Sequence, residues 1–86
     1  MKTQTKLPTY EQYKAIVDDM VASETLSIEQ SIILLTIFKA GLKGTCVHIN
    51  YLMQLTNMRW KEINWTLNGL VVQGAIKKLD KKYYSI

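Results

Sequence analysis

Four side chains near the C-terminal end of the sequence could hydrogen-bond to, or stack on, a planar ligand. They recur at the three- and four-residue spacing that places side chains on one face of a helix, and they are Lys61, Asn64, Trp65 and Asn68. Asparagine amides present a paired donor and acceptor to an adenine edge, and a lysine suits guanine or phosphate. These residues are therefore candidates for contact with DNA bases. Plain solvent exposure is the competing explanation, because most helices show a polar face.

Trp65 is the unusual member of this face, since a bulky ring has no obvious intramolecular reason to lie among polar side chains. Contact with thymine methyl groups or sugars and contact with a protein partner are equally compatible with its position. Partial burial under the segment that follows the helix is a third alternative.

A second set of candidate residues is basic and suits the phosphate backbone. Arg59 lies at the start of the same helix, where it could clamp a phosphate. Lys81 and Lys82 fall in the turn of a short hairpin and have the greatest reach. Lys77 and Lys78 precede that turn, and strand alternation predicts that they point to opposite sides.

The distribution of charge supports a polyanionic partner. Residues 39–86 hold eight basic and two acidic side chains, whereas residues 1–38 hold three basic and five acidic ones. Taken alone, this asymmetry is equally compatible with a cationic face for a polyanion and with an ordinary solvated lysine surface. The single cysteine cannot form an internal disulfide and no apolar run is long enough for a membrane span, so we expect a cytoplasmic protein with no membrane contact.

Enzymatic chemistry is not expected. Cys46 and His48 are the one cysteine and the one histidine, and alternation along a strand would put both on one face. No third residue is placed to orient them, and two ligands do not make a zinc site. We therefore predict no catalytic residue, no metal site and no cofactor.

Several local signals define the elements that must position these residues. Thr9 with Gln12 and Ser27 with Gln30 form two capping-box patterns, each opening a helix. We expect a tail over 1–8 and a single domain over 9–86. The domain begins with a helix from about 9, a helix over 28–40 ended by Gly41, and a strand over 45–49. A helix over 50–55 follows, then a final helix over 57–73 capped by Asn57 and stopped by Gly74, and last a hairpin over 76–86.

The second of these helices is apolar on more than one face. Such a helix is either central in the core or shared with a partner subunit. Combined with the apolar stripe of the first helix, this pattern predicts a homodimer whose interface includes Tyr13, Val17, Ile33 and Ile37. Leu52, Met53 and Leu55 are expected to face inward from the helix over 50–55.

The C-terminal pattern Ile63-x3-Leu67-x2-Leu70-x3-Gly74-x-Ile76 resembles the recognition-helix signature of bacterial winged-helix regulators of the MarR type. The resemblance covers most of residues 26–86 and implies a mainly α fold with a small β-hairpin, a winged helix-turn-helix of three to four helices plus a wing. The chain departs from that family in its short turn over 80–82 and in ending at the wing, without the long C-terminal helices that build the family's dimer.

The resemblance implies sequence-specific binding to double-stranded DNA, with the final helix in the major groove and the hairpin on the backbone. Transcription regulation by a homodimer is the expected activity, and the small size fits a phage or plasmid accessory protein. The alternative is a winged-helix module that binds another protein without reading DNA, because fold alone does not determine function.

Overall fold

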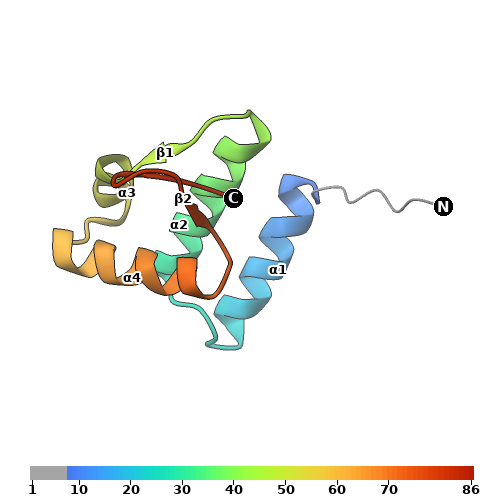
Figure 1. Ribbon diagram of the computed structural model, residues 1–86. Helices are drawn as coiled ribbons and strands as arrows, with labels where there is room; N and C mark the ends of the chain where they lie inside the picture. Colours follow the sequence, from blue (N-terminus) through green and yellow to red (C-terminus); the bar gives the residue numbers. More distant parts are fainter. Residues whose placement is uncertain (1–7) are drawn as a thin grey trace.

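The computed structural model describes residues 8–86, and its four helices and three short strands form one helical layer beside a small sheet (Figure 1). The predicted tail over 1–8 lies, apart from Pro8, outside the described residues. The elements are α1 (Tyr10–Ala22), α2 (Ile28–Leu42), β1 (Val47–His48), α3 (Ile49–Thr56), α4 (Trp60–Val72), β2 (Lys77–Lys78) and β3 (Tyr83–Ser85).

Both predicted capping boxes are present at the starts of α1 and α2. The Gln12 backbone N–H donates to Thr9 Oγ1 at 3.1 Å, and the Thr9 N–H donates to Gln12 Oε1 at 2.9 Å. Ser27 and Gln30 repeat this reciprocal pair at 3.1 and 2.9 Å. These bonds satisfy N–H groups that the first turn of a helix leaves unpaired.

The end of α2 differs from the prediction, because Gly41 lies inside the helix. The chain leaves α2 at Gly44, which adopts φ +74°, and the Thr45 N–H donates to the Ala40 carbonyl at 2.9 Å. This is the bonding of a glycine-terminated helix. Gly41 does not end the helix but lies close to Ile86: a Cβ at position 41 would be 2.6 Å from side-chain atoms of Ile86.

α2 is the central helix of the core, and this position explains its apolar character on several faces. It packs against α1, α3, β1 and β3. Val17, Ile33 and Ile37 are at most 2% exposed within a single chain. The prediction that these three form a dimer interface is therefore wrong, because a partner could reach them only by opening the core.

Tyr13, the fourth residue predicted at the dimer interface, also has an intramolecular partner. Its ring stacks on Phe38 of α2 with 4.0 Å between ring centroids and 5° between planes. Burial raises the pKa of Tyr13. The apolar stripe of α1 is thus used mainly to attach α1 to α2, although Ile16 remains 55% exposed.

The sheet is antiparallel with the strand order β1-β3-β2. Val47 pairs with Tyr84 and Lys78 also pairs with Tyr84, so β3 is the middle strand. Alternation along β3 buries Tyr84 completely and leaves Tyr83 41% exposed. The strand expected over 45–49 is shorter in the structure, where Val47–His48 joins the hairpin as a third strand and Ile49 already belongs to α3.

α3 and α4 form the helix-turn-helix, with some details that differ from the prediction. Asn57 adopts φ 57° and ends α3, whereas Arg59 is the residue that precedes α4. Leu52 is fully buried, but Leu55 is 43% exposed and does not face inward. The expected fold class, mainly helical with a small hairpin, is confirmed, and this arrangement is compatible with a helix-rich fold that carries a hairpin wing.

The buried Tyr84 hydroxyl has no hydrogen-bond partner among the described residues. A buried polar group without a partner carries a desolvation cost of about 1–3 kcal/mol. We therefore expect Tyr84→Phe to raise the free energy of unfolding by about 1 kcal/mol at pH 7, measured by urea denaturation. An unchanged or lower stability would show that this hydroxyl is in fact satisfied.

The same substitution should change stability at high pH. Burial raises the pKa of Tyr84, so this phenol ionises at a lower pH in the unfolded chain than in the folded one. The wild type should therefore lose stability as the pH rises past the usual pKa of 10.0. Tyr84→Phe should therefore lose less stability than the wild type between pH 9 and pH 11. Some alkaline loss should remain, because the pKa of Tyr13 is also raised.

Candidate nucleic-acid interface

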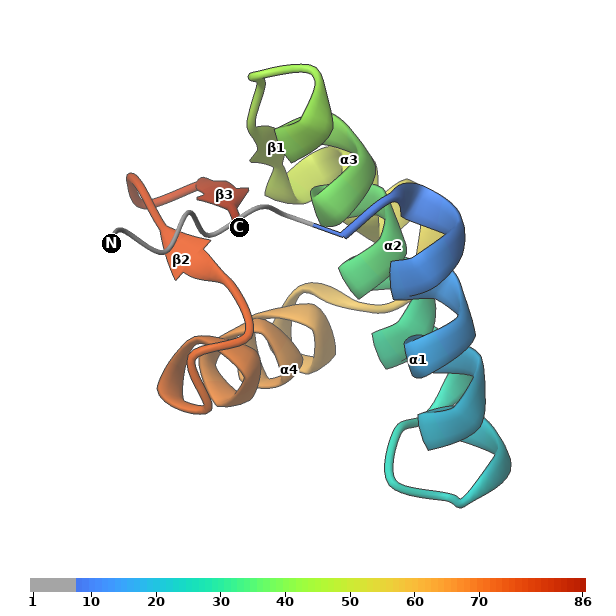
Figure 2. The same cartoon turned by 90° about the vertical axis from the view of Figure 1, so that its right-hand side faces the viewer.

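α4 is attached to the core along one side, which leaves its other side free. Ile63, Leu67 and Leu70 are at most 1% exposed and hold the helix against the rest of the chain. In Figure 2, α4 and the strand β2 that follows it lie on one side of the molecule, and α1 lies on the other. α4 therefore lies apart from the N-terminal helix.

This free face carries the side chains that the helical spacing predicts there. Lys61, Trp65 and Asn68 are exposed, and Asn64 lies half-buried at the edge of the face. Trp65 is 82% exposed, which rules out burial under the hairpin. Trp60, the first residue of α4, is 53% exposed.

The start of α4 directs Arg59 outward. The Glu62 carboxylate accepts a hydrogen bond from the Arg59 backbone N–H at 3.0 Å, and this bond fixes the first turn. The Arg59 residue is exposed. Arg59 therefore lies exposed at the N-terminus of α4, two residues before Lys61, where a phosphate could bind.

The end of α4 turns the chain directly into the hairpin. Gly74 adopts φ +80°, its N–H donates to the Val71 carbonyl, and the Ala75 N–H donates to the Leu70 carbonyl, both at 3.0 Å. This is the Schellman pattern, and it confirms Gly74 as the predicted helix stop. Because Ile76 is buried directly afterwards, the lysines that follow start close to the end of α4.

The hairpin presents four lysines, and all are exposed. Lys77 and Lys78 form the short edge strand β2, whose two residues are both accessible to solvent. Lys81 and Lys82 lie in the turn, which is closed by a 2.9 Å bond from the Leu79 N–H to the Tyr83 carbonyl. A further 2.8 Å bond from the Ile49 N–H to the Lys82 carbonyl ties the turn to the start of α3.

The positive charge on this side is not neutralised within the described part of the chain. Among residues 8–86, the one ion pair within 4.0 Å joins Lys14 and Asp18 on α1, and it raises the pKa of Lys14. Arg59, Lys61 and the hairpin lysines make no such pair. The face formed by α4 and the hairpin is thus cationic and open to an anionic partner.

The structure adds Gly69 and Val72 to this face. Val72 is 86% exposed, and a Cβ at Gly69 would meet no atom within 4 Å. The two residues lie four and seven positions after Trp65, so they continue the same side of the helix. For Val72, this helical spacing is the signal in the sequence that could have identified it.

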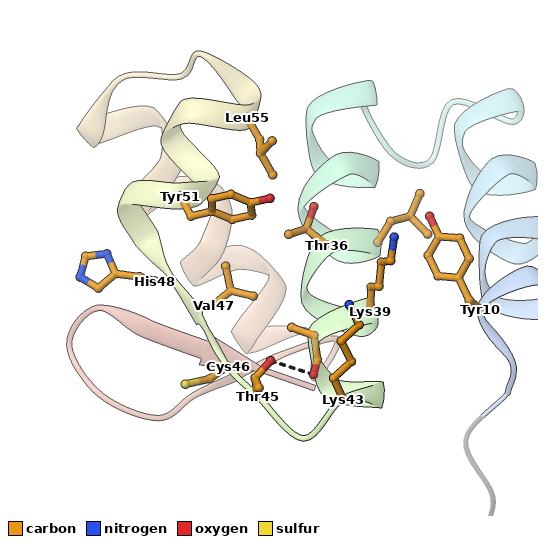
Figure 3. A pocket seen from close by; sticks show the side chains of 12 residues that line it. Tyr10, Thr36, Lys39, Lys43, Thr45, Cys46, Val47, His48, Tyr51 and Leu55 are labelled. Carbon is orange, nitrogen blue, oxygen red and sulfur yellow. Dashed lines mark hydrogen bonds between the residues drawn. The ribbon is translucent and has the colours of Figure 1, made fainter.

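A separate groove of about 570 Å³ lies between α2, α3 and β1, with Tyr10 of α1 at its rim (Figure 3). Lys39 and Lys43 line it from α2, and the ammonium of Lys39 lies 5.7 Å from the centre of the Tyr10 ring. No residue of α4 or of the hairpin lines this groove. Its lysines therefore belong to a different surface.

His48 and Cys46 do not form a joint site in the structure. The His48 Nδ1 accepts a hydrogen bond from the Asn50 N–H at 3.0 Å, and its ring meets Tyr83 edge to face at 4.9 Å. The histidine thus caps α3 and supports the hairpin, while Cys46 is exposed. These contacts give His48 a structural role in holding the helix-turn-helix against the wing.

The chain matches no known protein family, no curated protein and no solved structure. No helix in the described part of the chain is both long and apolar enough to cross a membrane. Its function must therefore be inferred from the site.

Proposed function

We propose that the protein binds double-stranded DNA in a sequence-specific manner as a small transcription regulator. The observation that carries this proposal is the free face of α4, on which Lys61, Trp65 and Asn68 are exposed. It is followed along the chain by hairpin lysines that form no ion pair with any of residues 8–86. The major groove of DNA is wide enough for an α-helix, and phosphates border it on both sides. The combination of a polar helix face and a cationic hairpin fits that geometry.

The proposed contacts divide into base reading and backbone binding. Lys61, Asn64, Trp65 and Asn68 would face base edges in the major groove. The backbone contacts would come from Arg59, Lys77, Lys78, Lys81 and Lys82. The resemblance of the segment over 63–76 to MarR-type regulators supports this division.

We place the protein in the cytoplasm and propose that it acts as a homodimer, because one helix reads only a few base pairs and two-fold symmetry doubles the site. With Val17, Ile33 and Ile37 in the core, the interface would use apolar side chains that the N-terminal helices leave exposed. Ile16 at 55% and Ile28 at 65% are the candidates.

The alternative function, a module that binds another protein, is favoured by the exposure of Trp65 and Val72. Large apolar side chains of this kind are typical of interface hot spots. The two functions differ in their response to salt, since an apolar protein contact should not weaken steeply with ionic strength.

We expect Asn64→Ala and Asn68→Ala to flatten the preference for one or two base pairs each. A bidentate amide contact discriminates by about 1–3 kcal/mol, and neither side chain is needed for the core. The measurement is binding to a randomised duplex library at equilibrium, followed by sequencing of the bound fraction. Non-specific affinity and folding should stay close to the wild type.

Gln54→Ala is the matched control, because it removes an exposed amide from α3 instead of α4. Its sequence preference should be that of the wild type. If both α4 variants also retain the wild-type preference, α4 does not read bases and the protein-binding function becomes the better account.

A further inference from the structure

The free face of α4 has an apolar strip that hydrogen bonding to bases does not explain. Trp65 is 82% exposed and Val72 is 86% exposed, and Gly69 lies between them. Seven residues of helix separate the two side chains, a rise of about 10 Å. That distance corresponds to about three base pairs of duplex DNA, at about 3.4 Å for each.

Gly69 has no intramolecular reason to be a glycine. It lies inside a regular helix, where glycine is less favourable than alanine, and its φ is not positive. A Cβ at this position would meet no atom within 4 Å, so no neighbouring element requires its absence. The missing side chain instead lets another molecule approach the helix backbone between Trp65 and Val72.

The charges around the strip indicate which molecule this is. Arg59 and Lys61 lie at one end of α4, and the hairpin lysines follow its other end. Thymine C5-methyl groups are the apolar groups that the major groove exposes, and they lie between two rows of phosphates. An apolar strip with cations at both ends matches that pattern.

Resting on the proposed DNA binding, we propose that Trp65 and Val72 contact thymine C5-methyl groups while Gly69 lets the backbone of α4 come close to the base edges. The protein therefore selects duplexes that carry thymine at these contacts. Asn68, exposed on the same face, is placed to read the adenine edge of a neighbouring pair.

The contribution of the thymine methyl group to affinity can be measured with two alternating duplex polymers. Poly(dA-dT) and poly(dA-dU) differ in the major groove only by the C5-methyl. The wild type should bind poly(dA-dU) about fourfold more weakly for each thymine methyl group that it contacts, the value of one buried methyl group. Trp65→Ala and Val72→Thr should each bring this ratio closer to one. Leu42→Ala, which removes an exposed apolar side chain from the C-terminal end of α2, should leave the ratio unchanged.

Gly69→Gln tests the close approach separately. Glutamine is a better helix former than glycine and has open space at this position, so the variant should melt at a higher temperature than the wild type. Its side chain should nevertheless weaken binding to both polymers severalfold. A more stable protein that binds less well is a result that misfolding cannot produce.

Each other outcome contradicts a particular step. Salt-dependent binding of equal strength to both polymers would overturn the methyl contact and leave DNA binding intact. A ratio that persists in Trp65→Ala and Val72→Thr would overturn the assignment to these residues, and wild-type binding by Gly69→Gln would overturn the close approach. Failure to bind either polymer at low salt would overturn the proposed function together with this inference.

Discussion

Replacing Lys77, Lys78, Lys81 and Lys82 together with alanine is expected to weaken binding to every DNA duplex, whatever its sequence. All four side chains are exposed, and none forms an ion pair within the described residues. If each contacts one phosphate, the slope of log affinity against log salt should fall in magnitude by about 3.6, at about 0.9 for each contact. Fluorescence anisotropy over a series of salt concentrations measures this slope.

A matched pair of double variants distinguishes the effect of phosphate contacts made by the hairpin from the effect of the protein's total charge. Lys81→Ala with Lys82→Ala should reduce the slope by roughly 1.8, the value for two phosphate contacts. Lys39→Ala with Lys43→Ala removes the same charge from the groove beside α3, which no residue of α4 or the hairpin lines. That second variant should leave the slope nearly unchanged. Equal reductions in both would show that overall charge, and not the hairpin, determines affinity.

Leu67→Ala is expected to lower the free energy of unfolding by about 2–5 kcal/mol, the usual cost of a cavity at a fully buried leucine. Leu67 is 0% exposed and is one of three residues that hold α4 on the core. The variant should also bind DNA more weakly, because the recognition face is no longer held in place. Urea denaturation measures the first effect, and anisotropy measures the second.

Val72→Ala, at an 86% exposed position on the same helix, is the control for stability. Its free energy of unfolding should stay within about 0.5 kcal/mol of the wild type. A cost below about 1 kcal/mol for Leu67→Ala would contradict the packing described for α4.

The parts of the fold that can be predicted correctly from the sequence depend on contacts between near neighbours. The capping boxes at Thr9 and Ser27 join residues three positions apart. At the Gly74 stop, two backbone N–H groups donate to carbonyls three and five residues earlier. The polar face of α4 follows from the spacing of Ile63 and Leu67 alone. Such signals are contained in one short window of sequence.

The sequence misleads where the decisive contact is distant along the chain. Gly41 resembles a helix stop, but it lies inside α2, where the Ile86 side chain packs close to it. The periodicity of Ile33 and Ile37 shows that one side of the helix over 28–40 is covered, but it does not show what covers it. The prediction of a dimer interface assigns that cover to a second subunit. In the structure α1, α3 and the sheet cover α2 within one chain. Gly69 escapes prediction because an open position in a helix leaves no mark on hydrophobic periodicity.

The most direct test of the central claim is the affinity of the wild-type protein for a mixed-sequence duplex at about 50 and 200 mM salt. Five backbone contacts, from Arg59 and the four hairpin lysines, predict a log-log slope of about −4.5 and a decrease in affinity of up to about 500-fold between these concentrations. Absence of binding at the lower concentration, or an affinity that does not change with salt, would contradict DNA binding by this face.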